Sequence, residues 1–158
     1  METITGTFKS EQNYINTNHV IVNAILNTKY QEAIEKNIVF VLQSNDLSKL
    51  TIQDEDLVIL LSNLLNNAIE ACEKCAQNRI LKMKFVIEGK KIILSVKNSY
   101  EKEVQYKEGV FLTSKEENKI EHGIGIRNMI DVIEKYGGSY AIKYEGNQFM
   151  FSILLPAP

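Results

Sequence analysis

The chain contains 158 residues, of which 44% are hydrophobic, and its formal net charge at pH 7 is −2. This length and apolar content are sufficient for one compact domain with its own core, without disulfides or a structural metal. The nearly balanced charge excludes a sequence-wide attraction to nucleic acid or to an anionic membrane, so any anion-binding site has to be local. No stretch approaches the roughly eighteen apolar residues of a membrane span, and the N-terminus lacks the pattern of a signal peptide, so we expect a soluble, cytosolic domain.

The N-terminal third of the chain predicts one helix and one strand. Residues 1–18 form a polar lead-in, with a short edge strand expected at 4–8. The residues at 16–18 offer N-caps for a helix over 19–36. The residues expected on the apolar side of this helix are Val20, Ala24, Ile25 and Ala33. The apolar run 38–42 predicts a buried strand, which is followed by a loop at 46–51.

A long helix is predicted over residues 54–75, with three acidic residues favouring its positive N-terminal end. Its core stripe consists of Leu57, Leu61, Leu64, Ala68, Cys72 and Cys75. At about 100° per residue, a polar row falls roughly a quarter turn from that stripe and contains Asn63, Asn67, Glu70 and Lys74. Asparagine is a mediocre helix former with several hydrogen bonds to satisfy, so the row is either a solvated edge or a site for a metal–phosphate group.

The only two cysteines, Cys72 and Cys75, form a CxxC motif within this helix. Such a motif can be a redox pair or half of a zinc site. No second pair of cysteines or histidines completes a zinc site, and both cysteines fall on or near the core stripe. We therefore predict buried, inert thiols.

The second half of the chain predicts two hairpins separated by a long loop and a helix. The predicted strands span residues 81–88, 91–98, 140–144 and 149–155. Residues 99–122 are mostly charged and lack a period, which is typical of a mobile loop or a functional lid. A helix over 125–136 stops at the glycine pair 137–138. The fold class predicted is an α+β two-layer sandwich, in which three helices cover one face of a mixed, mostly antiparallel sheet of about five strands.

Two segments besides the asparagine row could bind an anion. Residues 121–128 contain a GxGxxN motif that opens a helix, where glycines let backbone N–H groups approach a phosphate. A plain turn is the competing explanation, and a dinucleotide fingerprint is disfavoured because no βαβ unit surrounds the motif. Residues 111–115 carry hydroxyls and an ammonium group that either reach phosphate oxygens over a bound ligand or belong to an ordinary solvated loop.

In this order and spacing, the motifs resemble the ATP-binding module with the Bergerat fold that is shared by gyrase, the ninety-kilodalton heat-shock chaperones, histidine kinases and mismatch-repair MutL. The likeness is strongest to the catalytic domain of sensor histidine kinases of the peptide-quorum-sensing type. The matching segments are 63–68 for the N box, 111–115 for the lid motif, 122–128 for the G2 box, and 136–138 and 148–156 for the terminal pattern. The resemblance spans about residues 6–156 and implies a single domain over 1–158, with 99–122 as the ATP lid.

The resemblance implies a role for each residue that matches a motif position. Asn67 would coordinate Mg²⁺, and Asn63, one turn earlier, would support the phosphates of ATP. The residues that would meet the phosphates through backbone amides are Gly123 and Gly125, and those that would close the lid are Thr113 and Lys115.

The sequence departs from the family pattern at two positions. Asn98 replaces the aspartate that accepts a hydrogen bond from the adenine amino group, and an asparagine carbonyl can accept that bond only without charge assistance. The quorum-sensor subfamily commonly carries this replacement. Glu70 stands where many histidine kinases have a lysine, so the positive charge toward the phosphates would come from Lys115, Lys74 or Arg127.

The residue at position 63 also bears on the reaction. Hydrolysing relatives have a glutamate there that acts as general base toward water, and asparagine cannot accept a proton at neutral pH. The resemblance therefore implies a kinase, with a phosphoacceptor histidine on a helical dimerisation domain that precedes residue 6. Of the two histidines present, His122 lies in the G2 box and His19 is expected to be a surface or capping residue.

The implied partners are ATP, the phosphoacceptor helix of the chain's own full-length receptor, expected to be a homodimer, and a response regulator. The domain would be the cytoplasmic part of a membrane-bound receptor. Two alternatives from other classes remain open: a protein-interaction module that kept the fold but lost nucleotide binding, and an anti-sigma-factor type serine kinase.

Overall fold

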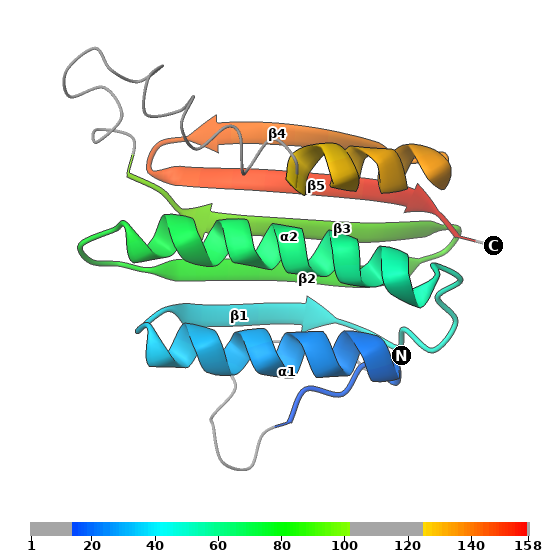
Figure 1. Ribbon diagram of the computed structural model, residues 1–158, viewed down its shortest axis with the longest axis horizontal. Coiled ribbons are helices and arrows are strands. Elements are labelled where there is room, and N and C mark those ends of the chain that lie inside the picture. Colours follow the sequence, from blue (N-terminus) through cyan, green and yellow to red (C-terminus); the bar gives the residue numbers. More distant parts are fainter. Residues whose placement is uncertain (1–13, 102–124, 158) are drawn as a thin grey trace.

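The computed structural model describes residues 14–101 and 125–157, which form two layers (Figure 1). One layer is a five-stranded sheet in the order β1-β2-β3-β5-β4, and helices cover one of its faces. This arrangement confirms the predicted α+β sandwich. The edge strand expected at 4–8 and most of the expected lid lie outside the described residues. Within those residues, no helix is long and apolar enough to cross a membrane.

The elements begin and end within two residues of their predicted positions. They are α1 (Val20–Glu35), β1 (Val39–Ser44), α2 (Asp54–Glu73), β2 (Ile80–Glu88), β3 (Lys91–Ser99), a third helix described over residues 125–135, β4 (Ser139–Glu145) and β5 (Gln148–Pro156). His19 is the N-cap of α1, where its Nδ1 accepts a hydrogen bond from the backbone N–H of Val22 at 3.4 Å. The expectation that His19 is a capping residue is therefore confirmed.

Strand pairing fixes which side chains share a face of the sheet. β1 pairs with β2 in parallel, and the other neighbours are antiparallel. The β3 residues that face the helices are Ile92, Leu94, Val96 and Asn98. Their directly opposed partners on β5 are Leu155, Ile153, Phe151 and Phe149. Because opposed residues point to the same side of an antiparallel pair, these β5 side chains also face the helices.

The two hairpins close through tight glycine turns. Gly89 and Gly146 both have φ of +60°, in the left-handed region that favours glycine. Each is the first of two residues between paired strands, the position at which a type II′ turn requires glycine.

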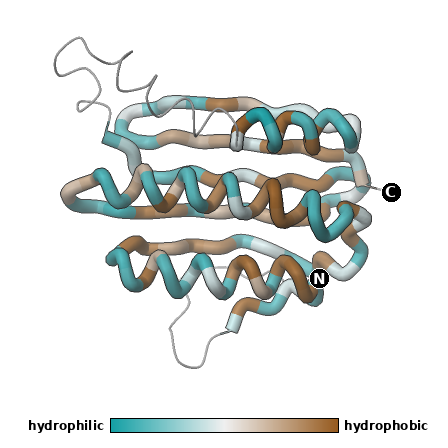
Figure 2. Tube along the Cα trace, in the orientation of Figure 1, coloured by the Kyte–Doolittle hydropathy of each residue, from teal (hydrophilic) through white to brown (hydrophobic). Residues whose placement is uncertain are grey.

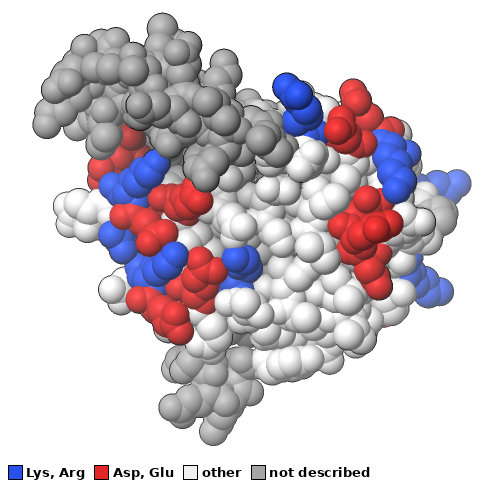
Figure 3. Space-filling model, viewed as in Figure 1, with Lys and Arg blue, Asp and Glu red and all other residues white. Residues whose placement is uncertain are grey.

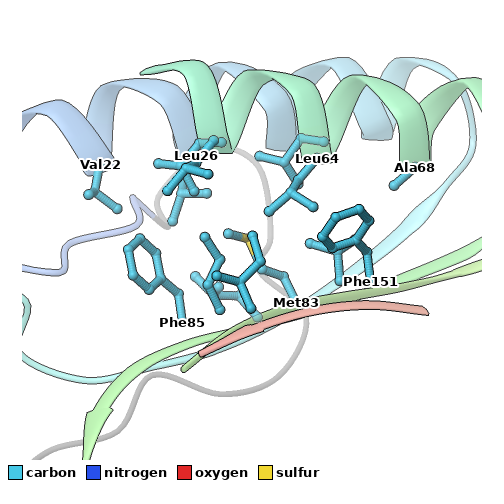
Figure 4. Close-up of a cluster of buried hydrophobic side chains, with 14 of the residues drawn as sticks. Val22, Leu26, Leu64, Ala68, Met83, Phe85 and Phe151 are labelled. Carbon is cyan, nitrogen blue, oxygen red and sulfur yellow. The ribbon is translucent and has the colours of Figure 1, made fainter. Parts of the chain in front are cut away.

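The hydrophobic core lies between the helices and the sheet, as Figure 4 shows for Leu26, Leu64, Met83, Phe85 and Phe151. Every residue of the core stripe predicted on α2 is buried. Figure 2 shows hydrophobic and hydrophilic residues interspersed along α1 and α2, as expected for helices with one side toward a core.

The apolar face of α1 was predicted only in part. Its buried residues are Val22, Asn23, Leu26, Tyr30 and Ala33, with Ile25 partly buried. Val20 is 80% exposed and Ala24 is exposed, so their predicted burial is wrong. The helix carries apolar residues on more than one side. Burying the side that carries the large Leu26 removes more apolar area from water than burying the side with Val20 and Ala24. Asn23 is buried beside that face because its Oδ1 accepts hydrogen bonds from the backbone N–H (2.7 Å) and hydroxyl (2.8 Å) of Thr17.

β1 also differs from its prediction as a buried strand. Phe40 and Leu42 are buried, whereas Val39 is 46% exposed. β1 lies at one edge of the sheet, and the described helices cover a single face, so its alternate residues point away from the core. An apolar run alone could not distinguish this half-buried strand from a fully buried one.

Candidate functional site

The polar row on α2 lies beside the buried stripe, as its spacing predicted. Asn63 and Asn67 are half-buried, whereas Glu70 and Lys74 are exposed. The Asn63 side chain has a fixed orientation because its Nδ2 donates a hydrogen bond to the backbone carbonyl of Ile59 at 2.7 Å. The amide oxygen of Asn63 is therefore directed away from its own helix backbone.

That oxygen lies against the first described residue of the third helix. A Cβ built on Gly125 would lie only 2.6 Å from Asn63 Oδ1 and 3.4 Å from Asn63 Cγ. Only glycine fits at this position without displacing the Asn63 amide or the helix. The structure thus brings together two of the predicted site residues, which are 62 positions apart in the sequence.

The neighbouring asparagines of α2 differ in their partners. Asn66 is exposed and its Oδ1 accepts a hydrogen bond from the ammonium group of Lys29 on α1. Asn67 is half-buried, and its side chain makes no hydrogen bond to another described residue. The Asn67 amide oxygen is accordingly available as a neutral oxygen ligand, the kind of donor that Mg²⁺ accepts.

Asn98 is buried on the helix-facing side of β3, where it is 2% exposed. Its Nδ2 donates a hydrogen bond to the backbone carbonyl of Ser99 at 2.9 Å. This bond occupies one donor, and Oδ1 accepts no hydrogen bond from another residue within 14–101 and 125–157, so it can serve as an acceptor for a ligand. The strand neighbour of Asn98 on one side is Leu81 and on the other Phe149.

A polar cluster that the sequence did not reveal joins α2 to the C-terminal end of the third helix. Asp56 Oδ2 accepts hydrogen bonds from the Tyr136 hydroxyl at 2.6 Å and from Lys135 Nζ at 2.9 Å. The Tyr136 oxygen also accepts a hydrogen bond from the backbone N–H of Gln53 at 3.0 Å. The hydrogen bond from Tyr136 and then that from Lys135 lower the pKa of Asp56. We call Asp56, Lys135 and Tyr136 the helix clamp.

No sequence signal pointed to the helix clamp, because its members are about eighty positions apart and Asp56 is equally well explained as a residue of an acidic first turn. The clamp acts at one end of the third helix, and the contact between Asn63 and Gly125 lies at the other. The third helix is therefore held against α2 at both of its described ends.

The two glycines after the third helix are favoured for different reasons, a left-handed backbone at Gly137 and close packing at Gly138. Gly137 has φ of +71°, and a Cβ on Gly138 would collide with the Leu155 side chain and lie 2.6 Å from the backbone oxygen of Leu154. The turn therefore brings the chain directly onto β5 before β4 begins.

Charged side chains lie mainly toward the two ends of the helices, and an uncharged band separates them (Figure 3). The acidic first turn of α2 lies at one of these ends. Arg127 is exposed two residues after Gly125, so its side chain remains a candidate for charge neutralisation beside the glycine. Three predicted site residues, Thr113, Lys115 and Gly123, lie outside the described residues.

The cysteines match the prediction of buried thiols. Cys72 and Cys75 are both free and buried, and burial raises the pKa of Cys72 to about 11. A thiol with such a pKa is almost entirely protonated near pH 7 and is a poor nucleophile. In the part of the chain that the structure describes, no group of three His, Cys, Asp or Glu residues could hold a metal ion.

Comparison with known proteins gives one family match. The family described as the GHKL domain matches residues 50–156, which include α2, the third helix and β2 to β5. None of the curated proteins matches the chain.

Solved structures of histidine kinases share the fold. The nucleotide-free catalytic domain of histidine kinase ThkA is 22% identical, with a TM-score of 0.65 over 99% of this chain and 96% of that chain. Acinetobacter baumannii histidine kinase AdeS is 14% identical, with a TM-score of 0.58 over 99% of this chain and 68% of that chain. ThkA in complex with the response regulator protein TrrA is 20% identical, with a TM-score of 0.57 over 91% of this chain and 41% of that chain.

Proposed function

Because the chain belongs to the GHKL domain family, which implies ATP binding, we propose that it is the catalytic domain of a sensor histidine kinase. In this proposal it binds ATP with Mg²⁺ and transfers the γ-phosphoryl group to a histidine. The observation that carries the proposal is the contact between Asn63 and Gly125, which unites the asparagine row with the glycine at the first described residue of the third helix.

The phosphates would lie between α2 and the N-terminal end of the third helix. Asn67 offers an amide oxygen with no partner among the described residues, which suits a Mg²⁺ ligand. Bound Mg²⁺ would neutralise charge on the β- and γ-phosphates. The residues proposed to hold the phosphates or to close over them are Asn63, Gly123, Gly125, Arg127, Thr113 and Lys115.

Asn98 would select the base. One of its two Nδ2 hydrogens is donated to the Ser99 carbonyl, and Oδ1 is the group that would accept a hydrogen bond from the adenine amino group. A neutral acceptor forms a weaker bond than an aspartate would, so base affinity is expected to depend on further contacts.

The identity of residue 63 favours transfer over hydrolysis. The side-chain amide of Asn63 is neutral. Its Nδ2 donates to the Ile59 carbonyl and its Oδ1 lies against Gly125, so Asn63 cannot remove a proton from water. ATP bound here would persist until an acceptor side chain arrives. His19 caps α1 through its Nδ1, and we assign it this structural role and not that of the acceptor.

We place the acceptor histidine on a dimerisation domain of the same receptor, which would be a homodimer of the quorum-sensing type with this single domain in the cytoplasm. A response regulator would receive the phosphoryl group afterwards. The crystallised complex of ThkA with TrrA supports a partner of that class.

The test is phosphoryl transfer from γ-labelled ATP to the receptor's dimerisation domain added as a separate protein. The proposal predicts label on that domain, lost on acid treatment because phosphohistidine is acid-labile. Acid-stable label would indicate the serine-kinase alternative. A wild-type domain that binds no ATP would indicate the degenerate interaction module. Asn98 and Glu70, which depart from the family pattern, are the observations that favour that alternative.

A further inference from the structure

Part of the helix-facing side of β4 and β5 carries exposed aromatic residues. Cross-strand pairing places Tyr140, Ile142 and Tyr144 on the same side as the core residues of β5. All three remain exposed, by 44%, 40% and 50% respectively. The described part of the third helix spans only one end of these strands, away from the β4–β5 turn (Figure 1).

Three rings gather at the end of the sheet that the third helix leaves uncovered. The ring centroids of Tyr144 and Phe149 are 5.0 Å apart, and those of Tyr100 and Tyr144 are 5.5 Å apart. Tyr100 is joined to the turn by a hydrogen bond from its backbone N–H to the Asn147 carbonyl at 2.8 Å. We call Tyr100, Tyr144 and Phe149 the aromatic cluster.

The aromatic cluster adjoins Asn98. Phe149 is the directly opposed partner of Asn98 on the neighbouring strand, and Tyr144 is the opposed partner of Phe149. Opposed side chains of an antiparallel pair share a face and have Cβ atoms about 5 Å apart. A planar base that donates a hydrogen bond to Asn98 Oδ1 therefore lies within reach of the Phe149 ring.

We propose that the aromatic cluster packs against the purine base of the bound nucleotide, with Phe149 making the contact and Tyr144 supporting its ring. The inference rests on the proposed nucleotide binding at Asn98. Aromatic contact compensates for the missing charge at position 98, because ring packing does not require an ionised acceptor. Phe149 and Tyr144 are then specificity-determining residues for the base.

The competing explanation is that the rings only stabilise the hairpin, since cross-strand aromatic pairs do so in many sheets. A second aromatic pair in the same hairpin provides a matched control for this explanation. Tyr140 lies on the same face of β4 and stacks on Phe151 at 5.7 Å between centroids, four residues away from Tyr144. Tyr140→Leu removes an equivalent cross-strand pair without touching the residues beside Asn98.

The experiment measures Mg²⁺-dependent binding of a non-hydrolysable ATP analogue and of inorganic tripolyphosphate by Phe149→Leu, Tyr144→Leu and Tyr140→Leu. We expect Phe149→Leu and Tyr144→Leu to weaken analogue binding by about five- to tenfold. Binding of tripolyphosphate, which has no base, is expected to stay unchanged in both. Tyr140→Leu is expected to change neither affinity.

Wild-type affinity for the analogue in Phe149→Leu and Tyr144→Leu would overturn the inference while leaving nucleotide binding intact. An equal loss in Tyr140→Leu, or a parallel loss of tripolyphosphate binding, would overturn it as well. If Phe149→Leu fails to fold, Tyr144→Leu decides the matter, because the Tyr144 side chain is half-exposed. If the wild-type protein binds no analogue, the proposed function itself fails.

Discussion

The two halves of the sheet are built differently. The half formed by β1, β2 and β3 lies under α1 and α2, and α2 alone buries nine residues. In the other half, every residue of β4 is exposed, and the third helix is joined to α2 through the helix clamp and the contact at Gly125. The third helix and β5 also contribute buried residues to the core, namely Met129, Val132, Ile133, Phe151, Ile153 and Leu155. The difference between the halves therefore lies in β4, which is exposed along its whole length.

This difference bears directly on the proposed site. Asn63 and Asn67 belong to the densely packed half, so their positions are fixed by the core of α2. Gly125 and the aromatic cluster belong to the other half, where exposed groups remain for a ligand. We infer that the site consists of asparagines fixed on α2 and a glycine at the first described residue of the third helix, which lies against Asn63.

The largest expected effect is on the packed half. Leu61 is fully buried in the core, so Leu61→Ala is expected to lower the free energy of unfolding by about 2–5 kcal/mol. Ile142→Ala on β4 removes a side chain that is 40% exposed and is expected to cost less than about 1 kcal/mol. Chemical denaturation of both variants measures the two losses of unfolding free energy. Equal losses would contradict the distinction between the packed half of the sheet and β4.

A smaller effect is expected where the two halves meet. Gly125→Ala places a methyl group against Asn63 Oδ1 and should cost about 1–3 kcal/mol of stability through overpacking. In an Asn63→Ala background the methyl group has room, and alanine is the better helix former, so the same substitution should become neutral or stabilising. A double-mutant cycle of unfolding free energies checks this, and additive effects would show that the contact is unimportant.

The helix clamp is expected to contribute less, and its contribution should depend on pH. Asp56→Asn replaces a charged acceptor of two hydrogen bonds and is expected to cost about 1–2 kcal/mol at pH 7. Because the folded-state pKa of Asp56 lies below its ordinary value of 3.8, the stabilisation is complete above that value and is lost as the pH falls through the folded-state pKa. Unfolding of wild type and Asp56→Asn between pH 7 and 2 should converge at the acid end, and a pH-independent difference would contradict the charge argument.

Local pattern was sufficient to predict the fold class and the described helices and strands, but not the strand order. Periodicity defined α2 and its stripe, and the glycines at 89 and 146 marked both hairpins, because these signals lie within a few residues of one another. The side of α1 that is buried was misjudged at Val20 and Ala24, since its apolar residues surround the helix and tertiary packing selects one side. Half-burial of β1 follows because the described helices cover only one face of the sheet, which a short apolar run does not encode.

The site could be predicted only where a motif is contiguous. The asparagine row and the glycine motif were each visible, but their contact through Asn63 and Gly125 depends on how the third helix packs on α2. The helix clamp and the aromatic cluster are assembled from distant segments and carry no local signal. Their detection required the cross-strand register and the packing of the helices.

The most direct test of the account is calorimetric titration with a non-hydrolysable ATP analogue, with and without Mg²⁺, of wild type, Asn67→Ala and the matched variant Asn66→Ala. The account predicts Mg²⁺-dependent binding in wild type and in Asn66→Ala, whose side chain is directed at Lys29. In Asn67→Ala, we expect the affinity for the analogue to fall by more than about tenfold and its dependence on Mg²⁺ to disappear. Unchanged Mg²⁺-dependent binding in Asn67→Ala, or the same loss in both variants, would contradict it.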